Sequence, residues 1–423
     1  MPLKIGLIGA TLWGNRGAEA MLVTTIGRLR RTFPDARFVI FSYSPSKDRE
    51  ILADPTIAVA AASPKALVLA HFPWAVIDRL LRSIGLRPPR GLLPRSAREL
   101  RELDVLLDLF GVSYADGRER FLPFNVLSNW PAMLFGVPVV KLAQSAGPFH
   151  NPLNRWIGRW MLGKCEKIHA RGEATRRYLD ELGIASDPSP DVAFLYEPDY
   201  SLTEENPDVI ANVRAQLAAW KASGHPIVGF SVSKVVKNMC DAHGMDYCAI
   251  LSAAAVDLID HGRRVVFLPN ATRGSELART LNDLPIIEQV LETLRTRGAP
   301  YAEAATGIRV DVNTRGLRQV ISECDVLVAS RFHGMIAALC EEVPLLVVGW
   351  GHKYEDTLRE FGLAELSIDF SSLKPGDLAA GVGSLLERRE QYRLQIRRHL
   401  PEVKRAADQA FNWLEGFLKA RAR

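Results

Sequence analysis

Two short segments in the last third of the chain carry the side chains best suited to binding an anion. Ser330-Arg331-Phe332-His333 follows the apolar run Asp325–Ala329, and Gly351-His352-Lys353 follows the next apolar run, Leu345–Val348. A helix-like segment separates them. Because parallel strands end at the same sheet edge, we expect four potentially cationic groups to converge there on a helix N-terminus. This arrangement predicts an anion site.

Arginine and histidine suit different parts of such a site. The planar guanidinium of Arg331 can hold a carboxylate or phosphate bidentately. His333 has an ordinary pKa of about 6.5, so it can act as a general acid or a general base. We therefore predict that Arg331 and His333 are catalytic, and that Ser330, His352 and Lys353 bind substrate.

A second candidate loop lies near the N-terminus. The apolar run Lys4–Ile8 leads into Gly14-Asn15-Arg16-Gly17 and then an amphipathic helix. Glycines allow a ligand close to the backbone, and a helix N-terminus offers N–H groups to an anion. The spacing matches neither the dinucleotide fingerprint nor the P-loop. We predict that Asn15 and Gly17 bind substrate, with a simple tight turn as the alternative.

Short apolar runs alternate with helix-like segments along most of the chain, which predicts parallel sheets covered on both faces. We expect two Rossmann-like doubly wound α/β lobes, with a boundary in the acidic, proline-bearing stretch Glu197–Asp208. The expected lobes are residues 1–200, with an insertion at about 60–100, and residues 201–400. Residues 401–423 show a one-face apolar pattern and predict a helix that packs back on the first lobe. The expected strands are Lys4–Ile8, Phe38–Phe41, Val105–Leu109, Val137–Leu142, Pro226–Ser231, Val265–Leu268, Val326–Ala329 and Leu345–Val348.

The charge balance, the cysteine pattern and the lengths of the apolar runs exclude several classes of protein. Fifty-three Lys and Arg against 48 Asp and Glu give a net charge of only +5, which argues against nucleic-acid coating. The five cysteines form no C-x-x-C pair, so we expect no structural zinc and a reduced, cytoplasmic environment. No apolar stretch approaches the length of about 18 residues that a membrane span requires.

The stretch Lys65–Arg95 mixes apolar runs with Arg79, Arg82, Arg87, Arg90 and Arg95. One interpretation is a surface that associates peripherally with the inner face of the plasma membrane. The other, which we favour, is an insertion packed on the first lobe with a solvated basic face. We expect Pro73, Pro88 and Pro89 to break any long helix here.

The candidate segments together resemble a known family. The opening Gly14–Leu22, the middle motifs Gln144–Phe149, Ala170–Glu173 and Pro190–Phe194, and the stretch from Ser330 to Glu355 are similar to the motifs of the polysaccharide pyruvyl transferase family. The resemblance runs from about Gly6 to Gly362, in order.

The resemblance implies a two-lobed GT-B-like fold with the active site in the cleft between the lobes. It implies transfer of a pyruvyl group, as a carboxyethylidene ketal, from phosphoenolpyruvate to hydroxyls of a sugar in a cell-surface glycan or exopolysaccharide, without a metal or other cofactor. A lipid-linked intermediate is one form of acceptor left open. Oligomeric state and acceptor sugar are not specified.

Two further residues follow from the resemblance. Arg171, after Lys167–Ala170, is predicted to bind the donor, with a surface ion pair to Glu173 as the alternative. Asp116 is predicted to bind substrate because the family usually has an acid after a glycine run here. This chain has Leu109-Phe110-Gly111 in place of that run, and Pro269-Asn270 where Pro-His is usual.

Two other functions stay open. A glycosyltransferase of the same architecture that uses a nucleotide-activated sugar would also need cations at a helix N-terminus. A non-catalytic scaffold of polysaccharide assembly could keep the fold without the chemistry.

Overall fold

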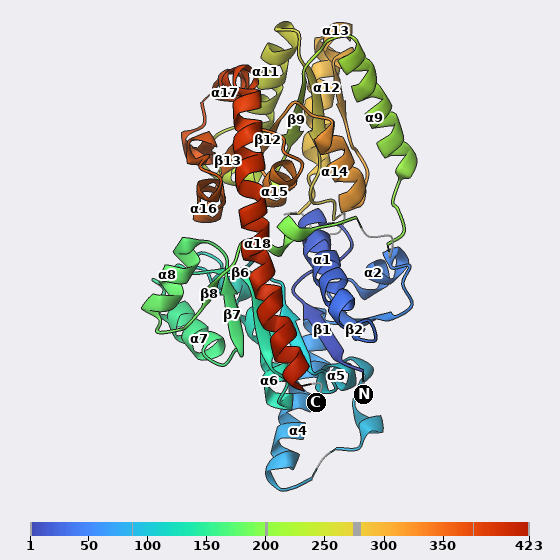
Figure 1. The fold of residues 1–423 in the computed structure, drawn as a ribbon, viewed down its shortest axis with the longest axis vertical. Coiled ribbons are helices and arrows are strands. Elements are labelled where there is room, and N and C mark those ends of the chain that lie inside the picture. Colours follow the sequence, from blue (N-terminus) through green and yellow to red (C-terminus); the bar gives the residue numbers. More distant parts are fainter. Residues whose placement is uncertain (1, 87, 199–201, 274–280, 375, 422–423) are drawn as a thin grey trace. The chain divides into compact units, whose positions relative to one another are not determined.

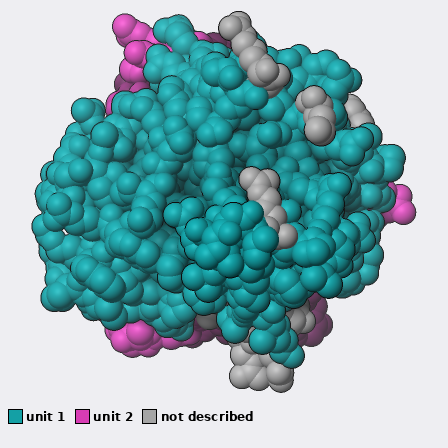
Figure 2. Space-filling model, turned by 90° about the horizontal axis from the view of Figure 1, so that it is seen from below, with its two compact units in different colours: residues 1–13, 18–203, 404–423 teal, residues 14–17, 204–403 magenta. Residues whose placement is uncertain are grey.

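Two parallel β-sheets organise the computed structural model of this 423-residue chain (Figure 1). The structure describes residues 2–86, 88–198, 202–273, 281–374 and 376–421. They form two compact units, which Figure 2 colours separately. Unit 1 comprises residues 1–13, 18–203 and 404–423, and unit 2 comprises residues 14–17 and 204–403.

The sheet of unit 1 has the strand order β3-β2-β1-β4-β6-β7-β8, with β5 beside β6, and its pairings are parallel. Most of its strand residues are buried, as expected where helices cover a sheet on both sides. The strands are β1 (Lys4–Ile8), β2 (Arg37–Ser42), β3 (Ile57–Ala61), β4 (Val105–Asp108), β5 (Val112–Ser113), β6 (Val139–Ala146), β7 (Lys167–Ala170) and β8 (Asp187–Pro188). The helices are α1 (Arg16–Thr32), α2 (Pro45–Ile51), α3 (Pro64–Ala66), α4 (Phe72–Ser83), α5 (Arg95–Arg101), α6 (Leu122–Phe135), α7 (Pro152–Leu162) and α8 (Glu173–Glu181).

The sheet of unit 2 has the order β11-β10-β9-β12-β13-β14, again with parallel pairings. This is the doubly wound Rossmann order, in which the chain reverses direction across the sheet between β9 and β12. The strands are β9 (Ile227–Ser231), β10 (Arg264–Leu268), β11 (Ala305–Gly307), β12 (Val326–Ala329), β13 (Leu345–Gly349) and β14 (Ser367–Asp369). The helices are α9 (Pro207–Ala222), α10 (Lys234–Ala242), α11 (Tyr247–Asp260), α12 (Leu284–Arg297), α13 (Ala299–Glu303), α14 (Thr314–Ser322), α15 (Phe332–Cys340), α16 (His352–Glu360) and α17 (Asp377–Glu387).

The last helix, α18 (Arg389–Arg421), belongs to both units. Its residues up to Val403 are grouped with unit 2, and those from Lys404 with unit 1. In unit 1, Trp413 packs edge-on against His169 of β7, with ring centroids 5.5 Å apart. The C-terminal part of α18 thus contacts β7 of unit 1 through Trp413.

The predicted strands are confirmed, with small differences at their ends. The chain passes from unit 1 to unit 2 between Thr203 and Glu204. Of the expected boundary stretch, residues 199–201 lie outside the described residues, as does Arg87 of the basic insertion.

The prediction that Pro73 breaks the insertion's helix is wrong. The segments α3, η1 (Leu67–His71) and α4 follow one another without a gap. The N–H of Phe72 donates to the carbonyl of Leu67, five residues back, which is the hydrogen bond of a π turn. Pro73 follows this wider turn directly, and such a turn makes room for a proline ring inside a helix.

No helix in the described part of the chain is long and apolar enough to cross a membrane.

Candidate anion-binding site

The candidate site of unit 2 lies at the carboxyl edge of its sheet, where the order reverses between β9 and β12. Helices α10, α15 and α16 begin at this edge, after β9, β12 and β13 respectively. Strands β12 and β13 pair in parallel, so the predicted adjacency of the Arg331 and Lys353 loops is confirmed. The first N–H groups of each helix lack intrahelical partners and favour an anion.

Arg331 is held at the start of α15 by a buried carboxylate. Its Nε donates to Oδ2 of Asp283 at 3.0 Å, and its Nη2 donates to Oδ1. The Asp283 side chain is fully buried and also accepts from the backbone N–H of Lys234 at 2.8 Å, Asn270 at 3.0 Å and Ala271 at 2.9 Å. Arg331 therefore has a fixed orientation, and Asp283 offsets its charge.

His333 packs against the N-terminal loop. A Cβ placed on Gly17 would lie 2.0 Å from its Nδ1, so only glycine fits there. The N–H of Gly17 donates to Oδ1 of Asn15 at 3.1 Å, and Asn15 forms an antiparallel bridge with Ala271. Asn15 and Gly17 thus belong to the same edge as His333, and the imidazole occupies the space that a side chain at position 17 would need.

Lys353 lies among aromatic rings at the start of α16. Its Nζ is 4.6 Å from the ring centroid of Trp350, 4.9 Å from that of Phe332 and 5.5 Å from that of Tyr354. The negative faces of these rings stabilise the ammonium charge. His352, the first residue of α16, is half-buried beside it. Cations can therefore gather here without large mutual repulsion.

Ser330 lies beneath this edge. Its side chain is buried, and its Oγ accepts from the hydroxyl of Tyr247 at 2.8 Å. The hydroxyl of Tyr354 donates to the Ser330 carbonyl at 3.3 Å. Burial raises the pKa of Tyr247 above its ordinary value, so this phenol stays a hydrogen-bond donor at neutral pH. These contacts position the loop that carries Arg331.

Arg171, at the end of β7 in unit 1, makes a saturated set of contacts. Its side chain is 3% exposed; Nη1 pairs with Asp191, Nε donates to Ser145 Oγ at 3.1 Å, and Nη2 donates to the Gly111 carbonyl. The carboxylate partner is Asp191 rather than Glu173. Arg171 therefore links the loops that follow several strands of unit 1.

Asp116 is similarly engaged within unit 1. Oδ2 accepts from the backbone N–H of His150 at 2.5 Å and Asn151 at 3.2 Å, and Oδ1 accepts from the Asn154 amide at 2.8 Å. Asp116 thus stabilises the entry to α7. Its role toward a substrate, like that of Arg171, stays a prediction.

The comparisons with known proteins bear on these motifs directly. The model of the polysaccharide pyruvyl transferase family matches residues 15–352. The chain belongs to this family. The match starts at Asn15 and ends at His352, so it contains the predicted site residues except Lys353.

Individual relatives agree with the family assignment. The chain is 22% identical over 419 residues to the amylovoran biosynthesis protein AmsJ of Erwinia amylovora, covering 94% of this chain and 95% of AmsJ.

The predicted two-lobed α/β fold of the GT-B type is confirmed by solved structures with little sequence identity. A putative UDP-N-acetylglucosamine 2-epimerase from Listeria monocytogenes has a TM-score of 0.59 at 12% identity and covers 99% of this chain and 98% of its own. The UDP-GlcNAc 2-epimerase from Neisseria meningitidis has a TM-score of 0.56 at 12% identity, covering 99% and 100%.

Two residues of this pyruvyl transferase family member escaped prediction. Asp283 stands directly before Leu284-Pro285, a pattern typical of a helix cap, but its carboxylate does not cap α12 and turns instead to Arg331. Arg16 is 2% exposed and pairs with Glu205 at 3.6 Å and Asp311 at 3.4 Å. For Arg16, the signal in the sequence was its position as a charged residue between two glycines, Gly14 and Gly17.

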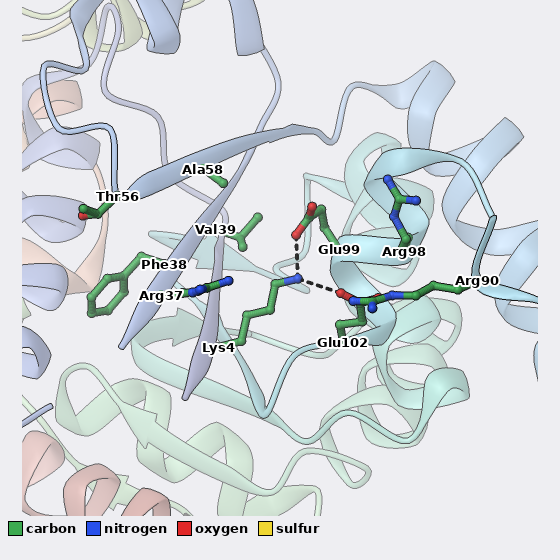
Figure 3. Close-up of a pocket in the computed structure, with 10 residues that line it drawn as sticks. All are labelled: Lys4, Arg37, Phe38, Val39, Thr56, Ala58, Arg90, Arg98, Glu99 and Glu102. Carbon is green, nitrogen blue, oxygen red and sulfur yellow. Dashed lines mark hydrogen bonds and ion pairs between the residues drawn. The ribbon is translucent and has the colours of Figure 1, made fainter. Parts of the chain in front are cut away.

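Two other features complete the description. In the described ranges, no group of three or more His, Cys, Asp or Glu side chains could hold a metal ion. A cavity of about 480 Å³ in unit 1 lies near Lys4, Arg37 and Glu102. Figure 3 shows the ammonium of Lys4 pointing to Glu99 and Glu102, 2.6 and 3.1 Å away. Because Lys4 and Arg37 begin their strands, this cavity is at the amino edge of the sheet, opposite the edge where ligands of such sheets bind.

Proposed function

We propose that this member of the polysaccharide pyruvyl transferase family transfers a pyruvyl group from phosphoenolpyruvate to two hydroxyls of a sugar in a cell-surface glycan or exopolysaccharide. The family membership supports the reaction class. The observation that carries the residue assignment is the placement of His333. Its imidazole packs on Gly17, and it lies two residues after Arg331, whose guanidinium is oriented by Asp283.

The donor has two acidic groups, and the edge offers complementary partners for both. Arg331 uses Nε and Nη2 on Asp283, which leaves Nη1 to bind a donor carboxylate or phosphate. His352, Lys353 and the N-terminal N–H groups of α15 and α16 supply the remaining positive potential. Because Asp283 offsets Arg331, these other groups carry the net attraction.

The chemistry needs proton transfers that His333 can perform. Protonation of the enol methylene makes the central carbon electrophilic, and a sugar hydroxyl adds to it. Phosphate leaves, and a second hydroxyl closes the ketal, with both hydroxyl protons released. We assign His333 as general acid or base in this sequence, with either direction of transfer open.

In this proposal, the predicted site residues of unit 1 serve the acceptor side. Arg171 and Asp116 position the loops at the carboxyl edge of the unit 1 sheet, the edge that we expect to bind the acceptor. The location of the active site between the lobes stays a prediction from the family resemblance. A lipid-linked glycan is one acceptor that the test below includes.

The decisive experiment incubates the full chain with phosphoenolpyruvate and a panel of synthetic and lipid-linked glycosides. Mass spectrometry should detect a carboxyethylidene group on one acceptor, with one phosphate released per ketal. Parallel reactions contain nucleotide-activated sugars. Glycosyl transfer from those donors, without ketal formation, would contradict the proposal. Thermal stabilisation by phosphoenolpyruvate but not by nucleotide sugars is the matching binding measurement.

A further inference from the structure

The insertion of unit 1 presents an apolar helical face to solvent. Segments α3, η1 and α4 form one uninterrupted helix from Pro64 to Ser83, and Figure 1 shows α4 extending away from the sheet of unit 1. Its inner face packs on α6 and in the core through Leu67 and Ala75. Large apolar side chains at helical spacing remain exposed along and just after it: Val68 50%, Leu69 72%, Ile77 40%, Leu80 62%, Ile84 69% and Leu86 57%.

Aromatic rings connect this face to helix α7. The ring of Phe72 lies 5.1 Å from that of Trp130 on α6, which lies 4.9 Å from that of Trp160 on α7. One turn before Trp160, the side chain of Trp156 is 68% exposed, and Leu153 is 56% exposed. Leu69 and Leu80 have the helical spacing that places them on the side of Phe72. We call the exposed side chains of Leu69, Leu80, Ile84, Leu153 and Trp156, together with the three partly exposed rings, the apolar belt.

The insertion and helix α7, which carry the apolar belt, hold an excess of cations. Residues 64–101 contain eight Lys or Arg and two acids. Both acids are engaged: Asp78 is buried and pairs with Arg82 at 2.7 Å, and Glu99 pairs with Lys4 at 2.6 Å. Helix α7 contains no acid. The exposed cations beside the belt are Lys65, Arg79, Arg155 and Arg159.

We propose that the apolar belt docks unit 1 on the surface of a bilayer that contains anionic phospholipids. Single exposed leucines are ordinary, but several large apolar side chains exposed along one helix, with an exposed Trp on a helix linked to it by packed rings, are not. Leu, Ile and Trp on one face with Lys and Arg beside them is the pattern of helices that lie in a membrane interface. The excess of cations is complementary to anionic headgroups, which attract nearby cations. The proposal is independent of the reaction and needs no donor or acceptor.

The test is flotation of the full chain with vesicles of phosphatidylcholine alone and with added phosphatidylglycerol. We expect strong binding only to the anionic vesicles, decreasing as salt rises. The double variant Leu80→Gln/Ile84→Gln should lower the partition coefficient about tenfold or more, because two side chains lose their transfer into the interface. Arg79→Gln/Arg159→Gln should lower it about tenfold and weaken the salt dependence.

Matched controls separate lipid binding from misfolding and from self-association of the chain. Leu394→Gln changes a leucine that is 61% exposed on α18 and should leave binding unchanged. Trp156→Gln, on a different helix, should also weaken binding, so the test does not depend on the folding of one variant. Absence of binding to anionic vesicles, wild-type binding by both belt variants, or a stable dimer in light scattering that Leu80→Gln/Ile84→Gln dissociates would overturn the proposal.

Discussion

Arg331 and Arg171 both lie at the carboxyl edge of a parallel sheet, yet their surroundings differ. Each follows a parallel strand and pairs with a buried carboxylate, Asp283 in unit 2 and Asp191 in unit 1. Arg331 keeps a side chain that is 13% exposed at the start of a helix, whereas Arg171 is 3% exposed and uses all three guanidinium nitrogens internally. The comparison teaches that position at the carboxyl edge does not by itself make an arginine available to a ligand.

Other buried charges of unit 1 extend the contrast. Lys141 is 1% exposed and its Nζ lies 2.5 Å from Oδ2 of Asp108. Asp108 also accepts from the Asn129 amide at 2.7 Å. A saturated buried network fixes loop geometry, because removing any one member leaves a buried polar group unsatisfied. We therefore expect substitutions in unit 1 to affect stability first and those at the unit 2 edge to affect turnover first.

The largest expected effect is on turnover. His333→Gln should lower the rate of ketal formation by about 10²–10⁴-fold, because it removes the proton-transfer group. Thermal stabilisation by phosphoenolpyruvate should persist. His261→Gln, an exposed histidine of the same unit, is the control and should behave like wild type. Equal turnover by His333→Gln would remove this imidazole from the mechanism.

The next largest effect tests the unit 1 side of the comparison. Arg171→Met should destabilise the protein by about 3–5 kcal/mol, because Asp191 is left as an uncompensated buried charge. Urea unfolding followed by tryptophan fluorescence measures this, and the exposed Arg176→Met is the control. If stability were kept and only donor affinity fell, Arg171 would be a donor ligand after all, as the sequence predicts.

A conservative substitution of Arg331 tests the unit 2 side of the comparison. Arg331→Lys keeps a charge near Asp283 but loses the planar fork, so donor affinity should fall about 10- to 100-fold. Titration calorimetry with phosphoenolpyruvate measures the affinity, and the exposed Arg309→Lys serves as control. A loss of stability without any change in donor affinity would make Arg331 equivalent to Arg171 and abolish the distinction.

The smallest expected effect is a pH dependence of the folding stability, caused by Glu360 in unit 2. Burial, with a contribution from Asp356, raises the pKa of Glu360 on α16 from 4.5 to about 7. Between these values the folded protein binds a proton that the unfolded chain releases, so stability should decrease as pH rises from 4.5 to 7. Glu360→Gln should remove about 1–2 kcal/mol of this decrease, given its partial exposure. Urea midpoints across this range provide the measurement, and the exposed Glu365→Gln should retain the wild-type slope.

Part of the candidate site was predictable from local sequence. The apolar runs before Ser330 and Trp350 define neighbouring parallel strands, and strand ends meet at one edge, so the proximity of the Arg331 and Lys353 loops follows directly. The glycine loop near Asn15 was recognised as a close-approach segment, although its partner His333 was not. Asp283 was missed because its local pattern indicates an ordinary helix start, and its arginine partner lies 48 residues away.

By itself, the sequence determined the two doubly wound lobes, the eight strands predicted from apolar runs, the family and the loops that carry Arg331 and His333, because these depend on local periodicity and short motifs. Only the tertiary structure decided which charges are neutralised: Asp283 orients Arg331, and Asp191 engages Arg171. It also decided that the helix through Pro73 continues and leaves Leu69 and Leu80 exposed. Ion partners and buried faces are set by contacts between residues distant along the chain, and local patterns carry no record of those contacts.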